Sequence, residues 1–344
     1  MKQTSSSTMV ELLTPIWQRL LQHSPIGIED NFFDLGGDSA LALQLFKEIA
    51  QVCGREMPPV MIYHAPTIAA LAALLEDPAT PRFPPLVLLK AGDQEPPVFL
   101  THGLGGSVID FYQVIKHLQA PHAIHGMQAR GIDGVDAPFD RIEDMAEFYL
   151  EAVRDLQPHG PYVLVGFSLG GLVTLEMAQR LIASGEKVAL LAMLDSYPHT
   201  TYLSLSQRVR LGLRQAWRRV AEVGTSPSRE ALSRLFRPSR RRRLTSGATY
   251  QLPEEASLSP AQQHVRDCAY RALTRYQPRF YPGKIRFVRA EISTYWPSNP
   301  GAVWSHLAEE FVVDTIPGDH LGIMTTHFDQ LGAVLSRYLR EALR

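Results

Sequence analysis

The sequence lacks the features that would place the protein in a membrane or on nucleic acid. No stretch approaches the roughly 20 apolar residues that a membrane helix needs. The first ten residues, MKQTSSSTMV, contain no apolar signal-peptide core. A formal net charge of −1 supplies no global field to attract nucleic acid or an anionic membrane. We therefore expect a cytoplasmic protein with neither kind of partner.

Cysteine is also scarce, with only Cys53 and Cys268 among the 344 residues. Neither has a partner at metal-ligand spacing, and each falls in an amphipathic helical pattern, which is typical of a buried, reduced thiol. We expect no metal site. The chain has an ordinary globular composition. Its length exceeds what a single hydrophobic core usually needs, which favours one large and one small domain.

The first part of the chain has only helical patterns. Apolar residues recur with helical spacing, and Thr67 is a favourable N-cap for the last helix of this part. The expected elements are helices at residues 10–23, 39–53 and 67–76, with a short helical turn near 60–63. We predict a small all-α bundle of four helices over residues 1–80.

A proline-rich stretch follows, with four prolines among residues 77–85. Such a composition disfavours helix and sheet and is typical of a stiff linker. We place the linker at residues 81–86 and a second domain at 87–344.

In the second domain, short apolar runs alternate with helical patterns such as 140–157 and 169–184. This alternation predicts an α/β domain with a largely parallel sheet. The strand-like runs are 86–89, 98–101, 123–127, 162–167, 188–194, 285–290 and 311–316. Residues 199–276 interrupt the alternation with a helical, arginine-rich pattern, which we interpret as a lid inserted over an active site.

The strongest chemical signal is a G-x-S-x-G motif, Gly166-Phe167-Ser168-Leu169-Gly170. It follows a strand pattern and precedes a helical one, which is the context of a nucleophile elbow. Glycine is needed on both sides because a side chain there would collide with the neighbouring strand and helix. We therefore predict that Ser168 is a nucleophile at a helix N-terminus, where the helix dipole favours developing negative charge.

A nucleophilic serine needs a base and an orienting carboxylate. Asp195 ends the apolar run VALLAML, at the edge of the sheet where ligands bind in open α/β folds. Asp314 and Asp319 are its rivals, but Asp314 lies within a strand pattern and Asp319 is adjacent to the candidate base. We choose Asp195.

For the base we choose His320, in the sequence IPGDHLGIM just beyond the last predicted strand. The order Ser168, Asp195, His320 is the order in which α/β-hydrolases place their triad. His327 is the second choice, because a helix over 325–342 should carry it away from the sheet edge.

The tetrahedral intermediate of such a reaction needs backbone N–H donors. Leu169, directly after the nucleophile, supplies one of them. The loop after the strand at 98–101 reads HGLGG, and its Gly103 is our second donor, with Leu104 next. We interpret His102 as structural.

A second serine stands in DNFFDLGGDSAL, residues 30–41. Either Asp38 or Ser39 caps the helix that begins here. A phosphodiester on Ser39 would meet the positive end of that helix, which makes the serine chemically suitable for modification.

DNFFDLGGDSALAL resembles the attachment motif of peptidyl carrier proteins, in which the serine of GGDS receives 4′-phosphopantetheine. APTIAALAALLED resembles the closing helix of such a carrier. Residues 96–340 resemble type I thioesterases through GFSLGG, LDSYP and GDH, in matching order, although HGLGG lacks the proline common in that family.

The resemblance implies that Ser39 bears the pantetheine arm, Ser168 takes the acyl chain, His320 is the general base and Asp195 orients it. It also implies an acyl or peptidyl thioester as substrate and a phosphopantetheinyl transferase as partner. Upstream condensation, ketosynthase or other domains of a nonribosomal-peptide or polyketide assembly line would deliver the chain. Three alternatives remain open: a free-standing serine esterase, an editing thioesterase, and a non-enzymatic carrier with an inactive hydrolase fold.

Overall fold

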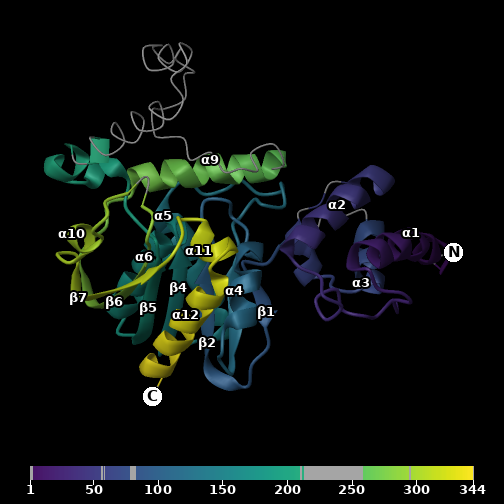
Figure 1. Cartoon of the computed structure of the whole chain (residues 1–344), viewed down its shortest axis with the longest axis horizontal. Helices are drawn as coiled ribbons and strands as arrows, with labels where there is room; N and C mark the ends of the chain where they lie inside the picture. Colours follow the sequence, from purple (N-terminus) through teal and green to yellow (C-terminus); the bar gives the residue numbers. More distant parts are fainter. Residues whose placement is uncertain are drawn as a thin grey trace, which may run out of the picture.

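The computed structural model describes residues 3–55, 57, 59–77, 83–209, 211–212, 259–293 and 296–343. It contains a small helical domain beside a larger α/β domain (Figure 1). Residues 78–82 of the proline-rich stretch, including 81 and 82 of the expected linker, lie outside the described residues. The first strand begins at Leu86, one residue before the expected start of the second domain.

The helical domain is built from three α-helices and one 3₁₀ turn. They are α1 (Gln3–Leu21), α2 (Ser39–Cys53), η1 (Pro59–Tyr63) and α3 (Ile68–Glu76). The expected fourth helix is thus a five-residue 3₁₀ segment, and α1 starts well before residue 10. Trp17, Phe32, Leu45 and Ile68 are fully buried in a core that belongs to this domain.

Polar side chains cap the starts of α2 and α3. The Asp38 carboxylate accepts the Leu41 N–H at 2.8 Å, so Asp38, rather than Ser39, is the N-cap of α2. The Thr67 hydroxyl accepts the Ala70 N–H at 3.1 Å at the start of α3. These caps satisfy backbone donors that have no partner within the helix.

The larger domain contains one sheet of seven strands in the order β1-β3-β2-β4-β5-β6-β7. Only β1 is antiparallel to its neighbour; each of the other pairings is parallel. The strands are β1 (Leu86–Lys90), β2 (Gln94–Thr101), β3 (His122–Met127), β4 (Tyr162–Phe167), β5 (Val188–Leu194), β6 (Tyr281–Ala290) and β7 (Ala308–Ile316). Every predicted strand is present, which confirms the α/β prediction.

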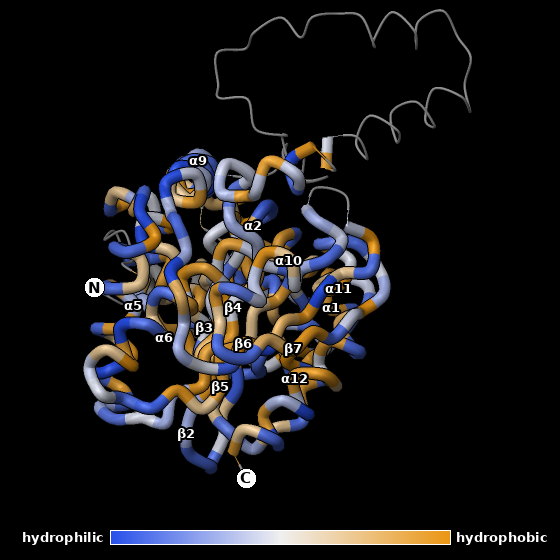
Figure 2. The backbone as a smooth tube through the Cα atoms, turned by 90° about the vertical axis from the view of Figure 1, so that its left-hand side faces the viewer, coloured by the Kyte–Doolittle hydropathy of each residue, from blue (hydrophilic) through white to orange (hydrophobic). Residues whose placement is uncertain are grey.

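Helices cover both faces of this sheet (Figure 1). On one face, α5 (Ile142–Leu156), α6 (Leu169–Ala183) and α9 (Pro260–Arg275) contribute to one core, and on the other face α4 (Tyr112–His117) and α12 (Phe328–Ala342) contribute to a second. Along β2, Phe99 enters the first core while Val98 and Leu100 enter the second. The apolar colour in Figure 2 accordingly concentrates on the strands.

The remaining short elements lie in the loops of the α/β domain. They are η2 (Ile109–Phe111), η3 (Thr200–Tyr202), α10 (Gly301–Trp304) and α11 (Gly322–Thr325). Of the expected lid at 199–276, residue 210 and residues 213–258 lie outside the described residues. The described end of that insertion is α9, which runs along the top of the sheet in Figure 1.

No helix in the described ranges has the length and apolar character needed to span a membrane. Both cysteines are free thiols; Cys268 is buried as expected, but Cys53 at the end of α2 is only half-buried.

Candidate active site and carrier loop

Ser168 occupies a sharp turn between β4 and α6. Its φ of 55° lies in the left-handed region, which is unusual for a residue with a side chain. A Cβ on Gly166 would lie 2.2 Å from the Gly170 carbonyl oxygen, and one on Gly170 would lie 2.4 Å from the Thr101 carbonyl oxygen. Only glycine fits at these two positions, so the turn has the strained geometry that the motif predicts.

Asp195 follows the last residue of β5 and is almost completely buried. Its backbone also has a positive φ, of 45°. One carboxylate oxygen accepts the Ala290 N–H at 3.1 Å from the end of β6, and the other lies 2.7 Å from His320 Nδ1. A buried carboxylate is costly unless it is bonded in this way.

His320 lies in the loop after β7, and its imidazole is largely buried with 12% side-chain exposure. Because Nδ1 donates to Asp195, Nε2 is the ring's acceptor nitrogen. The ring of Phe167, the residue before Ser168, stacks on the imidazole with centroids 4.8 Å apart. The structure thus brings His320 and Asp195 into contact and places both at the sheet edge of Ser168.

The rival residues have other contacts. Asp314 accepts hydrogen bonds from Arg337 and Tyr338 on α12, and Asp319 accepts the Gly322 N–H. The expected helix over 325–342 is wrong in detail, because α11 ends at Thr325 and α12 starts at Phe328.

His327 therefore stays near the sheet edge instead of being carried away from it. A Cβ on Gly318, in the loop that carries His320, would lie 2.7 Å from the His327 ring. The expected removal of His327 from the sheet edge is thus wrong, and the bond between His320 and Asp195 is what distinguishes the two histidines.

The glycine loop after β2 lies against the elbow. A Cβ on Gly103 would lie 3.6 Å from the Ser168 Cβ. The Gly103 carbonyl oxygen accepts the Gly106 N–H at 3.2 Å and lies 2.6 Å from His102 Nδ1. Leu169, the other expected donor, is the first residue of α6.

His102 is fully buried below this loop. Burial lowers the pKa of His102 to about 4, so the ring is neutral at physiological pH. With Nδ1–H donated to Gly103, Nε2 accepts the Tyr149 hydroxyl at 2.7 Å. These bonds agree with the structural role expected for His102, and they add Tyr149, which the sequence analysis missed.

The helix α9, at the end of the 199–276 insertion, packs on the same loop. A Cβ on Gly106 would come within 2.6 Å of Val265, on α9. Arg271 and Arg275 of α9 pair with Asp140, just before α5. The helix α9 therefore covers one side of the catalytic edge.

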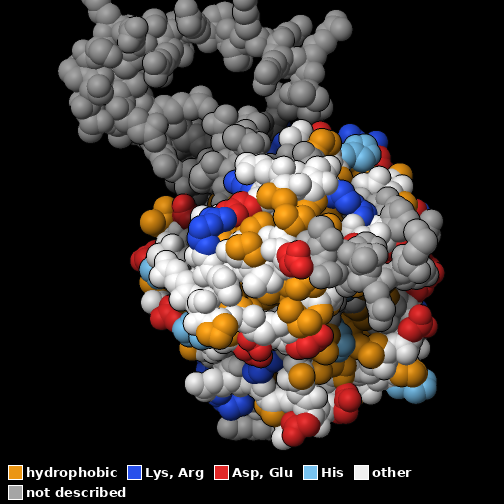
Figure 3. All heavy atoms as spheres, turned by 90° about the vertical axis from the view of Figure 1, so that its right-hand side faces the viewer, with side chains coloured by type: hydrophobic (Ala, Val, Ile, Leu, Met, Phe, Trp, Pro, Cys, Tyr) orange, Lys and Arg blue, Asp and Glu red, His pale blue; other side chains and the backbone are white. Residues whose placement is uncertain are grey.

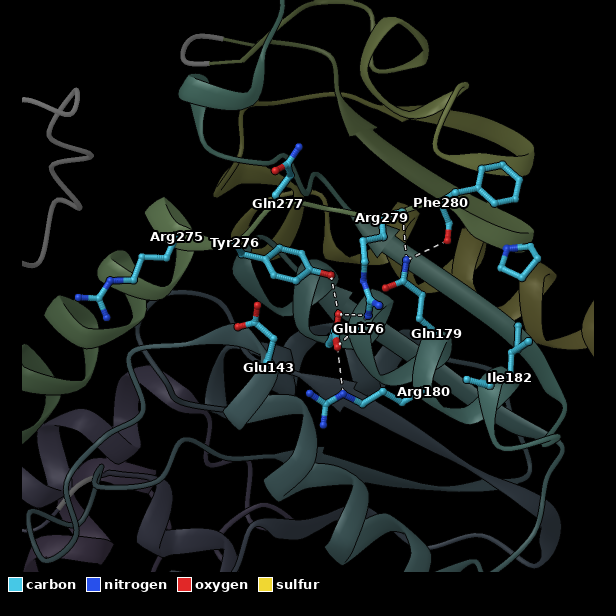
Figure 4. A pocket seen from close by; sticks show the side chains of 12 residues that line it. Glu143, Glu176, Gln179, Arg180, Ile182, Arg275, Tyr276, Gln277, Arg279 and Phe280 are labelled. Atoms are coloured by element: carbon cyan, nitrogen blue, oxygen red, sulfur yellow. Dashed lines mark hydrogen bonds and ion pairs between the residues drawn. The ribbon is translucent and has the colours of Figure 1, made fainter.

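A separate hollow of about 800 Å³ lies along the outer side of α6 (Figure 4). The buried Glu176 carboxylate there accepts hydrogen bonds from Arg180, Tyr276 and Arg279. Burial raises the pKa of Glu176, but these hydrogen bonds outweigh it and hold the pKa below its ordinary value. This cluster connects α6 to the segment that follows α9.

In the helical domain, Ser39 is the first residue of the 15-residue helix α2. The positive end of the α2 dipole favours an anion such as a phosphodiester at this position.

A family model described as "Thioesterase domain" matches residues 96–341. A second model, described as "Phosphopantetheine attachment site", matches residues 11–75. Each match coincides with one of the two domains.

Curated relatives include a dimodular nonribosomal peptide synthase of Bacillus subtilis (strain 168), 38% identical over 190 residues, or 55% of this chain and 8% of that protein. An indigoidine synthase of Dickeya dadantii (strain 3937) is 35% identical over 179 residues, or 52% of this chain and 12% of that protein. The chain thus spans only a small part of these relatives.

Among solved structures, a four-domain nonribosomal peptide synthetase bound to AMP and glycine has a TM-score of 0.59 at 22% identity, covering 96% of this chain and 26% of that one. The type II thioesterase of the borrelidin cluster has a TM-score of 0.53 at 18% identity, covering 74% and 97%. At these identities the likeness shows the fold alone.

The seven-stranded sheet, its covering helices and the serine elbow define a hydrolase-type α/β domain joined to a helical attachment domain. The chain belongs to the thioesterase domain family, since that model covers most of its length. It is a carrier–thioesterase didomain whose helical part is a phosphopantetheine attachment domain.

Proposed function

We propose that this didomain is a chain-terminating thioesterase, which takes an acyl or peptidyl chain from a phosphopantetheine arm on Ser39 to Ser168 and then releases it. One observation carries the proposal: the 2.7 Å bond from His320 to buried Asp195, beside the strained Ser168 and in one chain with an attachment domain. A free-standing esterase would have no need of that attachment domain.

The arm supplies a thiol that presents the chain as a thioester. His320 Nε2 takes the proton of Ser168 Oγ, and Oγ attacks the thioester carbonyl. Asp195 holds the ring in the tautomer with Nδ1–H and stabilises the imidazolium that forms. His320 then returns the proton to the departing sulfur, which leaves an ester on Ser168.

The negative charge of the tetrahedral oxygen needs fixed donors. The backbone N–H of Leu169, at the start of α6, is one proposed donor, and the helix dipole reinforces it. Gly103 is the second, because its loop lies against Ser168. The bonds of the Gly103 carbonyl to His102 and Gly106 hold that loop in place before the reaction.

In the second half-reaction His320 activates the attacking group. Water yields a linear acid, and an internal amine or hydroxyl of the chain yields a lactam or lactone. The lid, which we place at 199–276, sets the balance by excluding water and folding the chain.

Two kinds of partner follow from this proposal. A phosphopantetheinyl transferase loads Ser39, and upstream condensation or ketosynthase domains pass on the chain. The carrier exposes three large apolar side chains, Leu12, Ile28 and Val52, with exposures of 40%, 47% and 52%. Figure 3, a view from the carrier end, shows hydrophobic atoms among polar ones on this face of the molecule. Exposed apolar side chains of this kind offer contact area to such domains.

Intact-mass measurement tests the proposal. We expect coenzyme A and a broad phosphopantetheinyl transferase to add one pantetheine group to the wild type, and none to Ser39→Ala. After loading from acyl-coenzyme A analogues, Ser168→Ala should keep the acyl mass while the wild type loses it. The release rate of Ser168→Ala should be lower than that of the wild type by roughly 10³-fold or more. Release that survives in Ser168→Ala would refute the triad, and an adduct that survives in Ser39→Ala would refute the carrier site.

A further inference from the structure

The loop that precedes Ser39 is bonded to the thioesterase domain. The Tyr112 hydroxyl, at the start of α4, donates to the Gly37 carbonyl oxygen at 2.6 Å. Gly37 is buried and stands two residues before Ser39. A Cβ on Gly37 would lie 2.3 Å from the Phe32 ring, so the loop leaves room only for glycine here. The hydroxyl contacts backbone, and therefore recognises the shape of the loop rather than a side chain.

An aromatic contact surrounds this hydrogen bond. The two phenylalanines of the loop point in different directions: Phe32 is fully buried in the carrier core, whereas the Phe33 ring contacts the rings of both Tyr63 and Tyr112. The centroid of Phe33 is 4.7 Å from that of Tyr63 and 5.0 Å from that of Tyr112. Phe33 thus joins η1 of the carrier to α4 of the thioesterase domain.

Apolar packing extends the contact on both sides. Ile109, in η2 of the thioesterase domain, packs against the carrier core. Tyr63 and Phe83 pack against the buried pair Val87 and Val108. The carrier is therefore held by a continuous apolar surface and not by the linker alone.

This surface lies next to the catalytic edge. Tyr112 comes shortly after the glycine loop that lies against Ser168. The short helix α11, which starts two residues after His320, contacts both η2 and α4. The elements that hold the carrier loop are thus neighbours of the loops that carry the oxyanion donor and the base.

Tyr112 is in the protonation state that this contact needs. Burial raises the pKa of the Tyr112 hydroxyl, with Asp38 and Asp34 acting in the same direction and Lys116 opposing them. The Lys116 ammonium lies 4.4 Å from the Tyr112 ring centroid, where it attracts the π-face. The hydroxyl therefore stays a donor over the physiological pH range.

We propose that Tyr112, with Phe33 packed on its ring, docks the carrier's serine loop beside the triad, so that the chain is delivered within the same molecule. The inference rests on the proposed function for what is delivered, but the docking contact itself does not depend on the triad. Tyr112 is a positioning residue that touches the carrier and not the reacting atoms.

The test compares a tethered with a diffusible substrate. A panel of acyl N-acetylcysteamine thioesters identifies the acyl group that the wild type hydrolyses fastest, and that group is then loaded on Ser39 from its coenzyme A thioester. We expect Tyr112→Phe to slow single-turnover release from the carrier by about 2- to 10-fold, because one hydrogen bond is lost. Hydrolysis of the diffusible thioester should keep its kcat and KM.

Tyr162→Phe is the matched control. The Tyr162 hydroxyl also donates to backbone carbonyls, those of Gln157 and Pro158, but at the opposite end of β4. This variant should change neither rate. Equal slowing of both substrates by Tyr112→Phe would assign Tyr112 to the site itself, and no slowing of either would remove its docking role; both results overturn the inference.

Small-angle X-ray scattering gives a readout that needs no catalysis. The wild type should be compact, and Tyr112→Ala should have a larger radius of gyration as the carrier separates. An unchanged radius in Tyr112→Ala would overturn the docking inference even if release occurs. If the wild type releases no acyl group at all, the proposed function is wrong. The scattering result then decides by itself whether Tyr112 docks the carrier.

Discussion

At the scale of single residues, the site is marked by two strained positions. Ser168 and Asp195 have φ values of 55° and 45°, and both directly follow neighbouring parallel strands. Residues with side chains adopt such conformations where surrounding structure imposes them, and such positions gather at functional sites. Here the neighbouring strands β5 and β6 hold the two backbones, because the Ser168 N–H donates to the Leu194 carbonyl and the Asp195 N–H to the Val288 carbonyl.

The Asp195 carboxylate sets the tautomer of His320, which leads to the first prediction. Asp195→Asn keeps the side-chain volume but can present an N–H to Nδ1, which favours the ring with its proton on Nε2. We expect kcat for a diffusible acyl thioester to fall by roughly 10²–10⁴-fold with little change in KM. Steady-state kinetics measures this.

Asp319→Asn is the control, because Asp319 bonds the Gly322 N–H and not the base. It should keep activity near that of the wild type. If both variants lose activity equally, Asp195 has no special role as the orienting acid.

At the scale of elements, α6 connects two functions. Its first residue follows Ser168, the proposed nucleophile, and its middle carries Glu176, eight residues and so roughly 12 Å beyond Ser168 at about 1.5 Å per residue. Glu176 accepts hydrogen bonds from Tyr276 and Arg279, in the segment that follows α9. The helix that positions Ser168 therefore also anchors the segment after α9.

This anchor should depend on pH. Because the folded pKa of Glu176 lies below its ordinary value, its carboxylate stabilises the fold above the unfolded pKa of about 4.3, and this contribution is lost as pH falls through the folded value. Glu176→Gln should lower the free energy of unfolding by about 1–3 kcal/mol at pH 7. The difference should shrink towards pH 3 in denaturant titrations.

Glu147→Gln serves as the control, since Glu147 pairs with Arg180 from an exposed position. Surface pairs contribute only about 0–1 kcal/mol, so this variant should differ little from the wild type at either pH. A Glu176→Gln deficit that stays constant down to pH 3 would show that ionisation of Glu176 does not stabilise the fold.

At the scale of the whole molecule, two domains with separate cores are joined by a short stretch and by the Tyr112 contact. Linking two modules in this way raises their effective concentration for each other to about the millimolar range for short flexible linkers. Delivery within one chain should therefore exceed delivery between chains at micromolar protein.

Complementation between two variants measures this difference. Ser168→Ala supplies an acyl-loaded carrier and Ser39→Ala supplies an intact triad. Their mixture should release the chain at a rate proportional to protein concentration. At micromolar protein this rate should be about tenfold or more below that of the wild type. Wild-type release should be independent of concentration. Equal rates in the mixture and the wild type would show that the covalent link contributes nothing.

Much of the architecture could be predicted from the sequence because it depends on local patterns. Buried parallel strands form continuous apolar runs, so all seven strands were predicted; the structure extends five of them and leaves β4 and β5 with the predicted ends. The G-x-S-x-G motif predicted the elbow because its glycines meet neighbouring backbone. The helix that begins at Ser39 followed from the 3.6-residue spacing.

The rest was decided by contacts between distant parts of the chain. The 3₁₀ form of η1 and the place of His327 depend on packing that no local pattern encodes. Asp195 and His320 stand 125 residues apart and meet only because β5 and β7 end at the same edge of the sheet. Tyr112 and Gly37, 75 residues apart, and the three partners of Glu176 are likewise joined by tertiary structure. The sequence by itself thus determined which residues are chemically able to act, because reactivity and local backbone preferences are properties of short segments. Only the tertiary structure decided which of them face each other, because that depends on how the sheet, its covering helices and the carrier pack together.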